Sequence, residues 1–202
     1  CSFVCARFLV HLSLSFSFAQ RRNRVRRSRQ RNRRTTGRRF IDDFGFIRTL
    51  AQQMIEDFPI DSNRIYSTGW SNGCAMSQAL ANEESDLITA IACMSMYFIG
   101  DQDSSYSAIP VMEIHGFLDP IAPYAHVGPT GFFFQQEVWN TGAVQNLYTW
   151  KEMNSCSGNS PDLNEQEVYY NIQGFTDCDN GSEVTLVTLH AGTHNVYVND
   201  DT

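Results

Sequence analysis

Apolar and polar positions follow a regular pattern only from Phe40 onward. In the first regular segment, apolar residues recur at spacings of three and four, which is the period of an amphipathic helix. The helix is expected to begin near Asp42 and Asp43, since acidic residues favour a helix N-terminus, and to end before Pro59. The apolar positions are Phe46, Ile47, Leu50, Met54, Ile55 and Phe58.

Strand and helix patterns alternate along the rest of the chain. Helices are predicted at 72–82 and 142–153, and strands at 64–68, 87–94, 111–115, 168–172 and 184–190. The uninterrupted apolar run over 87–94 is typical of a strand that is buried on both faces. This alternation predicts an α/β sandwich with a mainly parallel sheet, formed by one domain over 40–202.

The segment 1–39 has a different composition. Its first twenty residues form an apolar stretch that weakly resembles the end of a signal peptide. Residues 21–39 are rich in Arg, Asn, Ser and Thr, with Val25 as their one large apolar residue, so they are expected to be disordered. One interpretation is a nucleic-acid or targeting arm. The preferred one is a segment foreign to the folded domain, such as a mistranslated stretch of a gene model.

Charge is divided at the same boundary. Twelve of the 15 basic residues precede Phe40, whereas all 22 acidic residues follow it. A domain this acidic repels nucleic acid and suits an exported protein, so no nucleic-acid partner is expected. The sequence has no apolar stretch of 18 residues, and we therefore expect no membrane-spanning helix.

The six cysteines include no Cys-x-x-Cys pair, so neither a zinc site nor a thioredoxin-type site is expected. Cys156 and Cys178 lie in polar, loop-like surroundings, which favours a disulfide formed in an oxidising compartment over two free thiols. Cys74 and Cys93 lie among apolar residues and are interpreted as unpaired, buried, small hydrophobic side chains.

The segment Gly69-Trp70-Ser71-Asn72-Gly73 matches the pattern Gly-x-Ser-x-Gly, between a predicted strand and a predicted helix. This strand–turn–helix context is that of a nucleophile elbow, in which flanking glycines permit a strained turn that exposes the serine hydroxyl. A plain glycine-rich turn is the alternative. The context favours Ser71 as a nucleophile.

A nucleophilic serine needs a base and a group that orients the base. His194 lies in a small-residue loop after the last predicted strand and is the favoured base, while His190 is interpreted as a side chain that packs at the strand end. Asp119 directly follows the strand at 111–115 and is the favoured acid. His115 is interpreted as a strand-end histidine whose ring bonds to the backbone.

Four separated blocks resemble the polyhydroxybutyrate depolymerase and feruloyl esterase group, related to the first carbohydrate esterase family. They lie at 42–48, 63–73, 113–124 and 192–194. The resemblance implies an α/β-hydrolase fold and a secreted carboxylic ester hydrolase with no metal or cofactor. Its substrate would be a polyhydroxyalkanoate polyester or a feruloyl or acetyl ester of a polysaccharide. Cys156 and Cys178 stand where the group often carries a late disulfide.

The sequence departs from this group before residue 40. The group's members begin with several strands and a His-Gly loop that supplies an oxyanion donor, whereas residues 1–41 contain one glycine and no His-Gly pair. We therefore expect that N-terminal strands are missing and that Asn72 supplies one of two oxyanion N–H groups. A serine peptidase of this fold and an inactive, acidic, extracellular binding protein remain alternatives. Trp70 and Tyr124 are interpreted as lining the acyl pocket or as structural residues, and the oligomeric state is left open.

Overall fold

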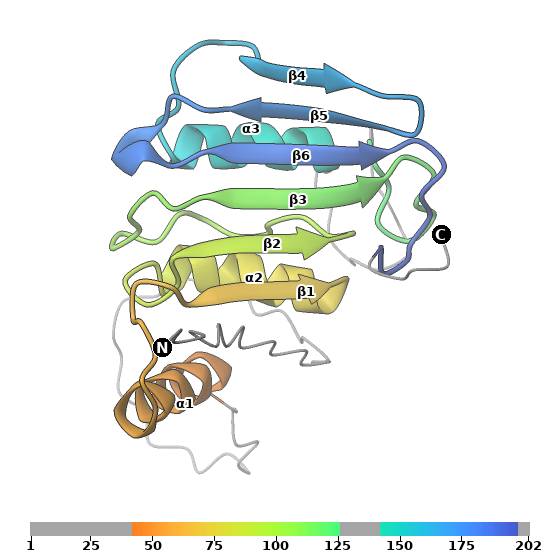
Figure 1. Ribbon diagram of the computed structural model, residues 1–202. Helices are drawn as coiled ribbons and strands as arrows, with labels where there is room; N and C mark the ends of the chain where they lie inside the picture. The colour runs from red at the N-terminus through yellow and green to blue at the C-terminus, as the bar shows by residue number, and fades with distance from the viewer. Residues whose placement is uncertain (1–41, 126–141, 198–202) are drawn as a thin grey trace, which may run out of the picture.

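The computed structural model describes residues 42–125 and 142–197. The predicted segment 1–39 and His126 lie outside the described residues. Within them, six strands form a single sheet in the order β1-β2-β3-β6-β5-β4 (Figure 1). The strands are β1 (Tyr66–Trp70), β2 (Ala90–Met94), β3 (Val111–Gly116), β4 (Leu163–Gln166), β5 (Tyr170–Phe175) and β6 (Val184–Leu189).

The first four strands of this order pair in parallel, and the last two join antiparallel. Parallel pairing brings the carboxyl ends of β1, β2, β3 and β6 to one edge of the sheet, on the right in Figure 1. The loops that follow β3 and β6 meet at this edge. A mainly parallel α/β sheet was predicted from the sequence, and the structure confirms it.

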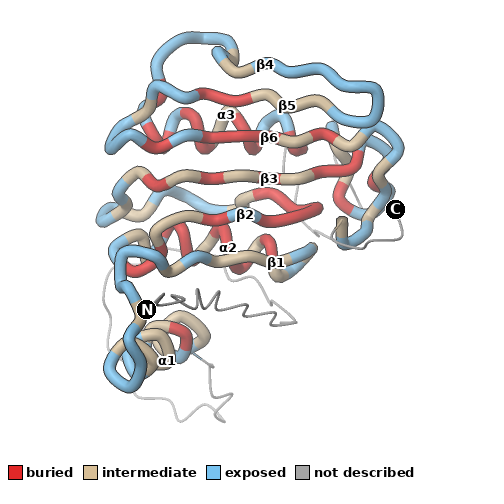
Figure 2. Tube along the Cα trace, viewed as in Figure 1, coloured by how far each residue is buried: buried red, intermediate tan, exposed pale blue. Residues whose placement is uncertain are grey.

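Helices α2 (Asn72–Glu83) and α3 (Ala143–Met153) cover the same face of the sheet (Figure 1). The main core lies between them and the strands, where Trp150, Phe175 and Leu186 are almost wholly buried. Figure 2 shows the buried positions concentrated in these helices and the central strands, while β4 is largely exposed. Burial of large apolar side chains in this layer is the main stabilising term of the fold.

Helix α1 (Asp43–Asp57) lies beyond β1, at the edge of the sheet (Figure 1). The side chain of Asp42 caps the helix by accepting a hydrogen bond from the amide of Gly45 at 2.9 Å, as the acidic start predicts. Arg48 pairs with Glu84 and Asp86, which lie just beyond α2. These ion pairs connect α1 to the end of α2.

Three strand boundaries differ from the prediction. Leu87 and Ile88 are still in the turn out of α2, because both amides bond to the carbonyl of Glu84, so β2 begins only at Ala90. Strand β1 begins and ends two residues later than predicted. The predicted strand 168–172 is displaced to Tyr170–Phe175, since residues 167–169 form the tip of a hairpin.

The interpretation of Cys74 and Cys93 as unpaired side chains is wrong. Both are fully buried, as expected, but they form a disulfide between α2 and β2. No local sequence pattern indicates this bridge, because the parallel register that brings Cys93 next to α2 is a tertiary feature. The predicted bridge between Cys156 and Cys178 is present.

We expect mass spectrometry of a non-reduced digest to find both pairs bridged. Replacing Cys156 with Ser should lower the free energy of unfolding by roughly 3 kcal/mol, because the bridge closes a loop between residues 22 apart and restricts the unfolded chain. Chemical denaturation of the variant and of the unmodified chain, both without a reducing agent, measures this loss. Free thiols at Cys156 and Cys178 in protein purified without reductant would contradict the pairing.

Candidate active site

Ser71 occupies the sharp turn between β1, which ends at Trp70, and α2, which begins at Asn72. Its backbone has φ 54° and ψ −119°, a conformation that residues other than glycine rarely adopt. A Cβ atom on Gly69 would lie 2.3 Å from the carbonyl carbon and oxygen of Gly73. The pattern Gly-x-Ser-x-Gly therefore has a steric cause, because glycine at position 69 lets the strand and the helix approach closely.

His194 bridges Ser71 and Asp119. Its Nε2 lies 2.9 Å from the Oγ of Ser71, and its Nδ1 lies 2.8 Å from the Oδ2 of Asp119. Ser71, His194 and Asp119 are far apart in the sequence, yet they are joined in this order by two consecutive hydrogen bonds. The side chain of Asp119 is wholly buried and that of His194 is 11% exposed.

Two glycines allow the loops that carry Asp119 and His194 to pack backbone against backbone. A Cβ on Gly116 would lie 2.3 Å from the carbonyl oxygen of Gly192, and one on Gly192 would lie 2.8 Å from the Cα of Gly116. The amide of Leu118 donates to the same Gly192 carbonyl at 2.9 Å. The separation of Asp119 and His194 is therefore set by direct backbone contact.

The second carboxylate oxygen of Asp119 is held by its own loop. The amides of Ile121 and Ala122 both donate to Oδ1 at 2.8 Å. Hydrogen bonds to the charged form of a carboxylate stabilise it, and here they also fix the plane of the group so that Oδ2 faces His194. Asp119 is thus placed to hold the proton of His194 on Nδ1 and to leave Nε2 toward Ser71.

Exposed apolar side chains flank Ser71, Asp119 and His194 in the sequence. The ring of Trp70 lies 5.1 Å from the ring of His194, centroid to centroid. Other exposed apolar residues next to the three polar ones in sequence are Phe117, Leu118, Ile121 and Val196. Asn72 is the first residue of α2, where an amide has no acceptor within the helix and the helix dipole favours negative charge.

The other predicted positions lie away from Ser71. The ring nitrogens of His190 lie within hydrogen-bond distance of the carbonyl of Val168 and the side chain of Asn171, so His190 is bonded to the β4–β5 hairpin. The Tyr124 hydroxyl bonds to Thr188 at 2.8 Å, and burial raises the pKa of this phenol. Trp70 therefore remains a candidate for the acyl pocket, whereas Tyr124 is half-buried and packs against the core.

The sequence analysis missed a buried polar group behind Asp119. His115 bonds through Nε2 to the backbone carbonyl of Ala122, as predicted, but its Nδ1 lies 2.6 Å from a buried carboxylate, Glu113. The side chain of Asn146 from α3 also contacts Glu113. The ionisable residues Glu113 and His115 alternate with Met112 and Ile114 along β3, and this was the available signal for a polar group inside the core.

Within residues 42–125 and 142–197, no three His, Cys, Asp or Glu side chains cluster as a metal site would require. None of the helices in this part of the chain has the length and apolar character of a membrane span.

A family model, two related sequences and one solved structure with a similar fold all belong to esterases. Residues 27–155 match the family model described as phospholipase/carboxylesterase. The chain is 27% identical over 158 residues to feruloyl esterase B of Piromyces equi, and 32% identical over 82 residues to feruloyl esterase C of Emericella nidulans. An acetyl xylan esterase from Aspergillus awamori has a similar fold, with a TM-score of 0.55 at 13% identity over 78% of this chain and 64% of the other.

These alignments cover 76% and 41% of this chain, respectively, for the two feruloyl esterases. They span only 29% and 30% of the relatives' own lengths. The comparisons therefore support the family and the fold of this chain, whereas the activities named for the relatives belong to considerably longer proteins.

Proposed function

Because the chain belongs to the phospholipase/carboxylesterase family, we propose that it is a serine carboxylesterase that uses Ser71, His194 and Asp119. The single observation that carries the proposal is the position of His194, which lies within hydrogen-bond distance of both the Ser71 hydroxyl and the Asp119 carboxylate. A serine hydroxyl is a weak nucleophile until an oriented base removes its proton, and this arrangement provides that base.

The reaction has two halves. Ser71 Oγ attacks the ester carbonyl carbon while His194 Nε2 accepts the hydroxyl proton, and the proton then passes to the leaving alcohol as its C–O bond breaks. In the second half, His194 accepts a proton from water, which attacks the acyl-enzyme, and returns it to Ser71 as the acid leaves. The Asn72 amide donates to the oxyanion in both halves, with support from the α2 dipole.

We infer that the acyl group is apolar and that the substrate is a feruloyl or acetyl ester of a polysaccharide. The exposed apolar side chains of Trp70, whose ring lies beside His194, and of Phe117, two residues before Asp119, suit an aromatic acyl group. The names of the two feruloyl esterase relatives support the same class. A polyhydroxyalkanoate polyester is the second candidate, because the four sequence blocks also resemble polyhydroxybutyrate depolymerases.

We also propose that the protein acts outside the cell. Two disulfides within the described residues favour an oxidising compartment, since cytosolic reductants keep most thiols reduced. The acidic character of residues 40–202 is compatible with export.

The test is an assay of the full chain on four substrates: p-nitrophenyl acetate, methyl ferulate, a 3-hydroxybutyrate oligomer and alanine p-nitroanilide. We expect hydrolysis of the first two and no cleavage of the anilide. Turnover of the hydroxybutyrate oligomer above that of methyl ferulate would assign the polyester. Cleavage of the anilide would indicate a peptidase, and no turnover of any substrate would indicate an inactive binding protein.

A further inference from the structure

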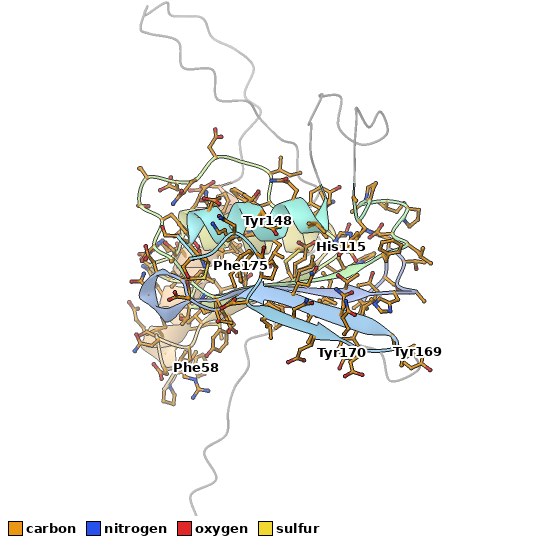
Figure 3. The ribbon with its side chains drawn as sticks, turned by 90° about the horizontal axis from the view of Figure 1, so that it is seen from above. Phe58, His115, Tyr148, Tyr169, Tyr170 and Phe175 are labelled. Atoms are coloured by element: carbon orange, nitrogen blue, oxygen red, sulfur yellow. A yellow bond between two sulfur atoms is a disulfide. The ribbon has the colours of Figure 1, made fainter. Side chains whose placement is uncertain are left out.

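Glu113 and His115 are two ionisable side chains buried in the core, outside the hydrogen-bonded chain of Ser71, His194 and Asp119. They lie two residues apart on β3 and therefore on the same face of the strand, 3% and 0% exposed. Figure 3 shows His115 on the side of the sheet that α3 covers. Burying two such groups costs free energy unless each is fully hydrogen-bonded, so their arrangement requires an explanation.

The proton positions follow from the partners. The amide of Phe98 donates to Oδ1 of Asn146, which orients that side chain so that its Nδ2 donates to Oε2 of Glu113 at 2.5 Å. His115 Nε2 lies 2.8 Å from the carbonyl oxygen of Ala122, which only accepts, so Nε2 carries a proton. One further proton lies in the 2.6 Å contact between His115 Nδ1 and Glu113 Oε1. The pair is therefore neutral overall, on whichever atom that proton lies.

The ionisation of the pair supports this assignment. Burial raises the pKa of the Glu113 carboxyl. Burial opposes the charge on His115, yet the hydrogen bond and the charge of Glu113 raise the pKa of the imidazole above its ordinary value. Both shifts favour retention of the shared proton as the pH rises, and His115 keeps the Nε2–H that bonds to Ala122.

The same peptide segment that His115 holds also holds Asp119. His115 donates to the carbonyl of Ala122, while the amides of Ala122 and Ile121 donate to Asp119 Oδ1. His115 Nε2 also lies 3.6 Å from Asp119 Oδ2, the oxygen that faces His194. The hydrogen bonds run from Asn146 through Glu113 and His115 to the turn at 119–122 and then to Asp119.

We propose that Glu113 and His115 are positioning residues for Asp119: Glu113 fixes the Nε2–H form of His115, which anchors the turn whose two amides orient the Asp119 carboxylate toward His194. The inference rests on the proposed function, because it assigns the two residues a task only if Asp119 serves His194. Neither side chain touches the substrate, so each acts through Asp119 alone.

Other groups around His115 pack against it without replacing this contact. The ring of Tyr97, from the segment after β2, stacks on the imidazole at 6.1 Å between centroids, and Tyr124 meets it edge-on at 6.0 Å. The titratable groups that face His115 are thus Glu113, Asp119, Tyr97 and Tyr124. Of these, Glu113 bonds to Nδ1, and Asp119 is the one that connects His115 to His194.

The main test replaces His115 with Leu in the full chain and measures p-nitrophenyl acetate hydrolysis from pH 5 to 9. We expect kcat to fall by about 10- to 100-fold and KM to change by less than about three-fold, because the displaced group acts on the reacting residues rather than on substrate binding. The acidic limb of kcat against pH should move to lower pH, since the protonated form of His194 loses part of its counter-charge. A purely structural role for His115 would not move that limb.

Two further variants provide matched controls. In Glu113→Gln, the new amide can donate to His115 Nδ1 and accept from Asn146, so kcat should stay within about five-fold of the unmodified protein, with the acidic limb in place. In an Asp119→Asn background, His115→Leu should lower kcat by less than about three-fold, because the group it positions is already absent. Thermal unfolding shows whether each variant is folded.

If His115→Leu does not fold, the proposal can still be tested on the unmodified chain through the protonation of His115. Two-bond proton–nitrogen spectra of histidine-labelled protein should show a protonated Nε2 on His115 throughout pH 5–9. The proposal is overturned if Nε2 of His115 is unprotonated, or if a folded His115→Leu variant has the same dependence of kcat on pH as the unmodified chain. It is also overturned if His115→Leu lowers kcat by as much in the Asp119→Asn background as it does in the unmodified chain. Failure of the proposed function differs, because then either the unmodified chain turns over none of the ester substrates or activity survives in Ser71→Ala.

Discussion

Ser71→Ala should lower kcat for p-nitrophenyl acetate by roughly 10⁴- to 10⁶-fold, the loss expected when the nucleophile of a serine hydrolase is removed. The expectation depends on the turn at Ser71, whose strained backbone directs the hydroxyl toward His194 Nε2 at 2.9 Å. His194→Ala should cause a loss of similar size, and the double variant should be no worse than either single one, because the two residues act as one unit.

The control for this series is His190→Ala. His190 is exposed and bonds to the β4–β5 hairpin rather than to Ser71, so its loss should leave kcat nearly unchanged. All variants are compared at one protein concentration, after thermal unfolding has shown that they are folded. Activity that survived in His194→Ala but disappeared in His190→Ala would reverse the assignment of the base.

Features determined by local sequence could be predicted. The strand–turn–helix around Ser71 is encoded within five residues, since glycine at position 69 lets the strand approach the backbone of Gly73. Helix α3 was predicted nearly to the residue because its apolar period is regular and Gly142 directly precedes it. The positions of Asp119 and His194, in the loops that follow β3 and β6, agree with the rule that functional side chains lie at the carboxyl ends of parallel strands.

Features determined by tertiary contact could not be predicted. Strand β4 has a single apolar residue, Leu163, because it is an exposed edge strand with no alternating pattern to detect. The bridge between Cys74 and Cys93 depends on the register of β2 against β1 and α2. The hydrogen bond from Asn146 to Glu113 joins residues 33 positions apart, and neither residue alone signals the other.

The two glycines in the loops that carry Asp119 and His194 show how backbone packing, rather than side-chain chemistry, sets the geometry of these two residues. Gly116 ends β3, and its Cα faces the peptide of Gly192, two residues before His194. A methyl group at position 116 would meet the Gly192 carbonyl oxygen at 2.3 Å and the Tyr197 hydroxyl at 2.6 Å. No rotamer relieves a contact with backbone, so the His194 loop must move away from the Asp119 loop.

Gly116→Ala should therefore lower kcat for p-nitrophenyl acetate by about 100-fold, because displacement of reacting groups by about 1 Å costs roughly that factor. Gly181→Ala is the matched control: this glycine has φ +64° but no atom within 4 Å of an added Cβ, and it lies at the opposite end of β6 from His194. The control should lose about 1 kcal/mol of stability through its left-handed backbone and keep its kcat. Steady-state kinetics and thermal unfolding of both variants separate displacement of the site from loss of stability. A Gly116→Ala variant with kcat within about three-fold of the unmodified chain would show that the two loops do not depend on this contact.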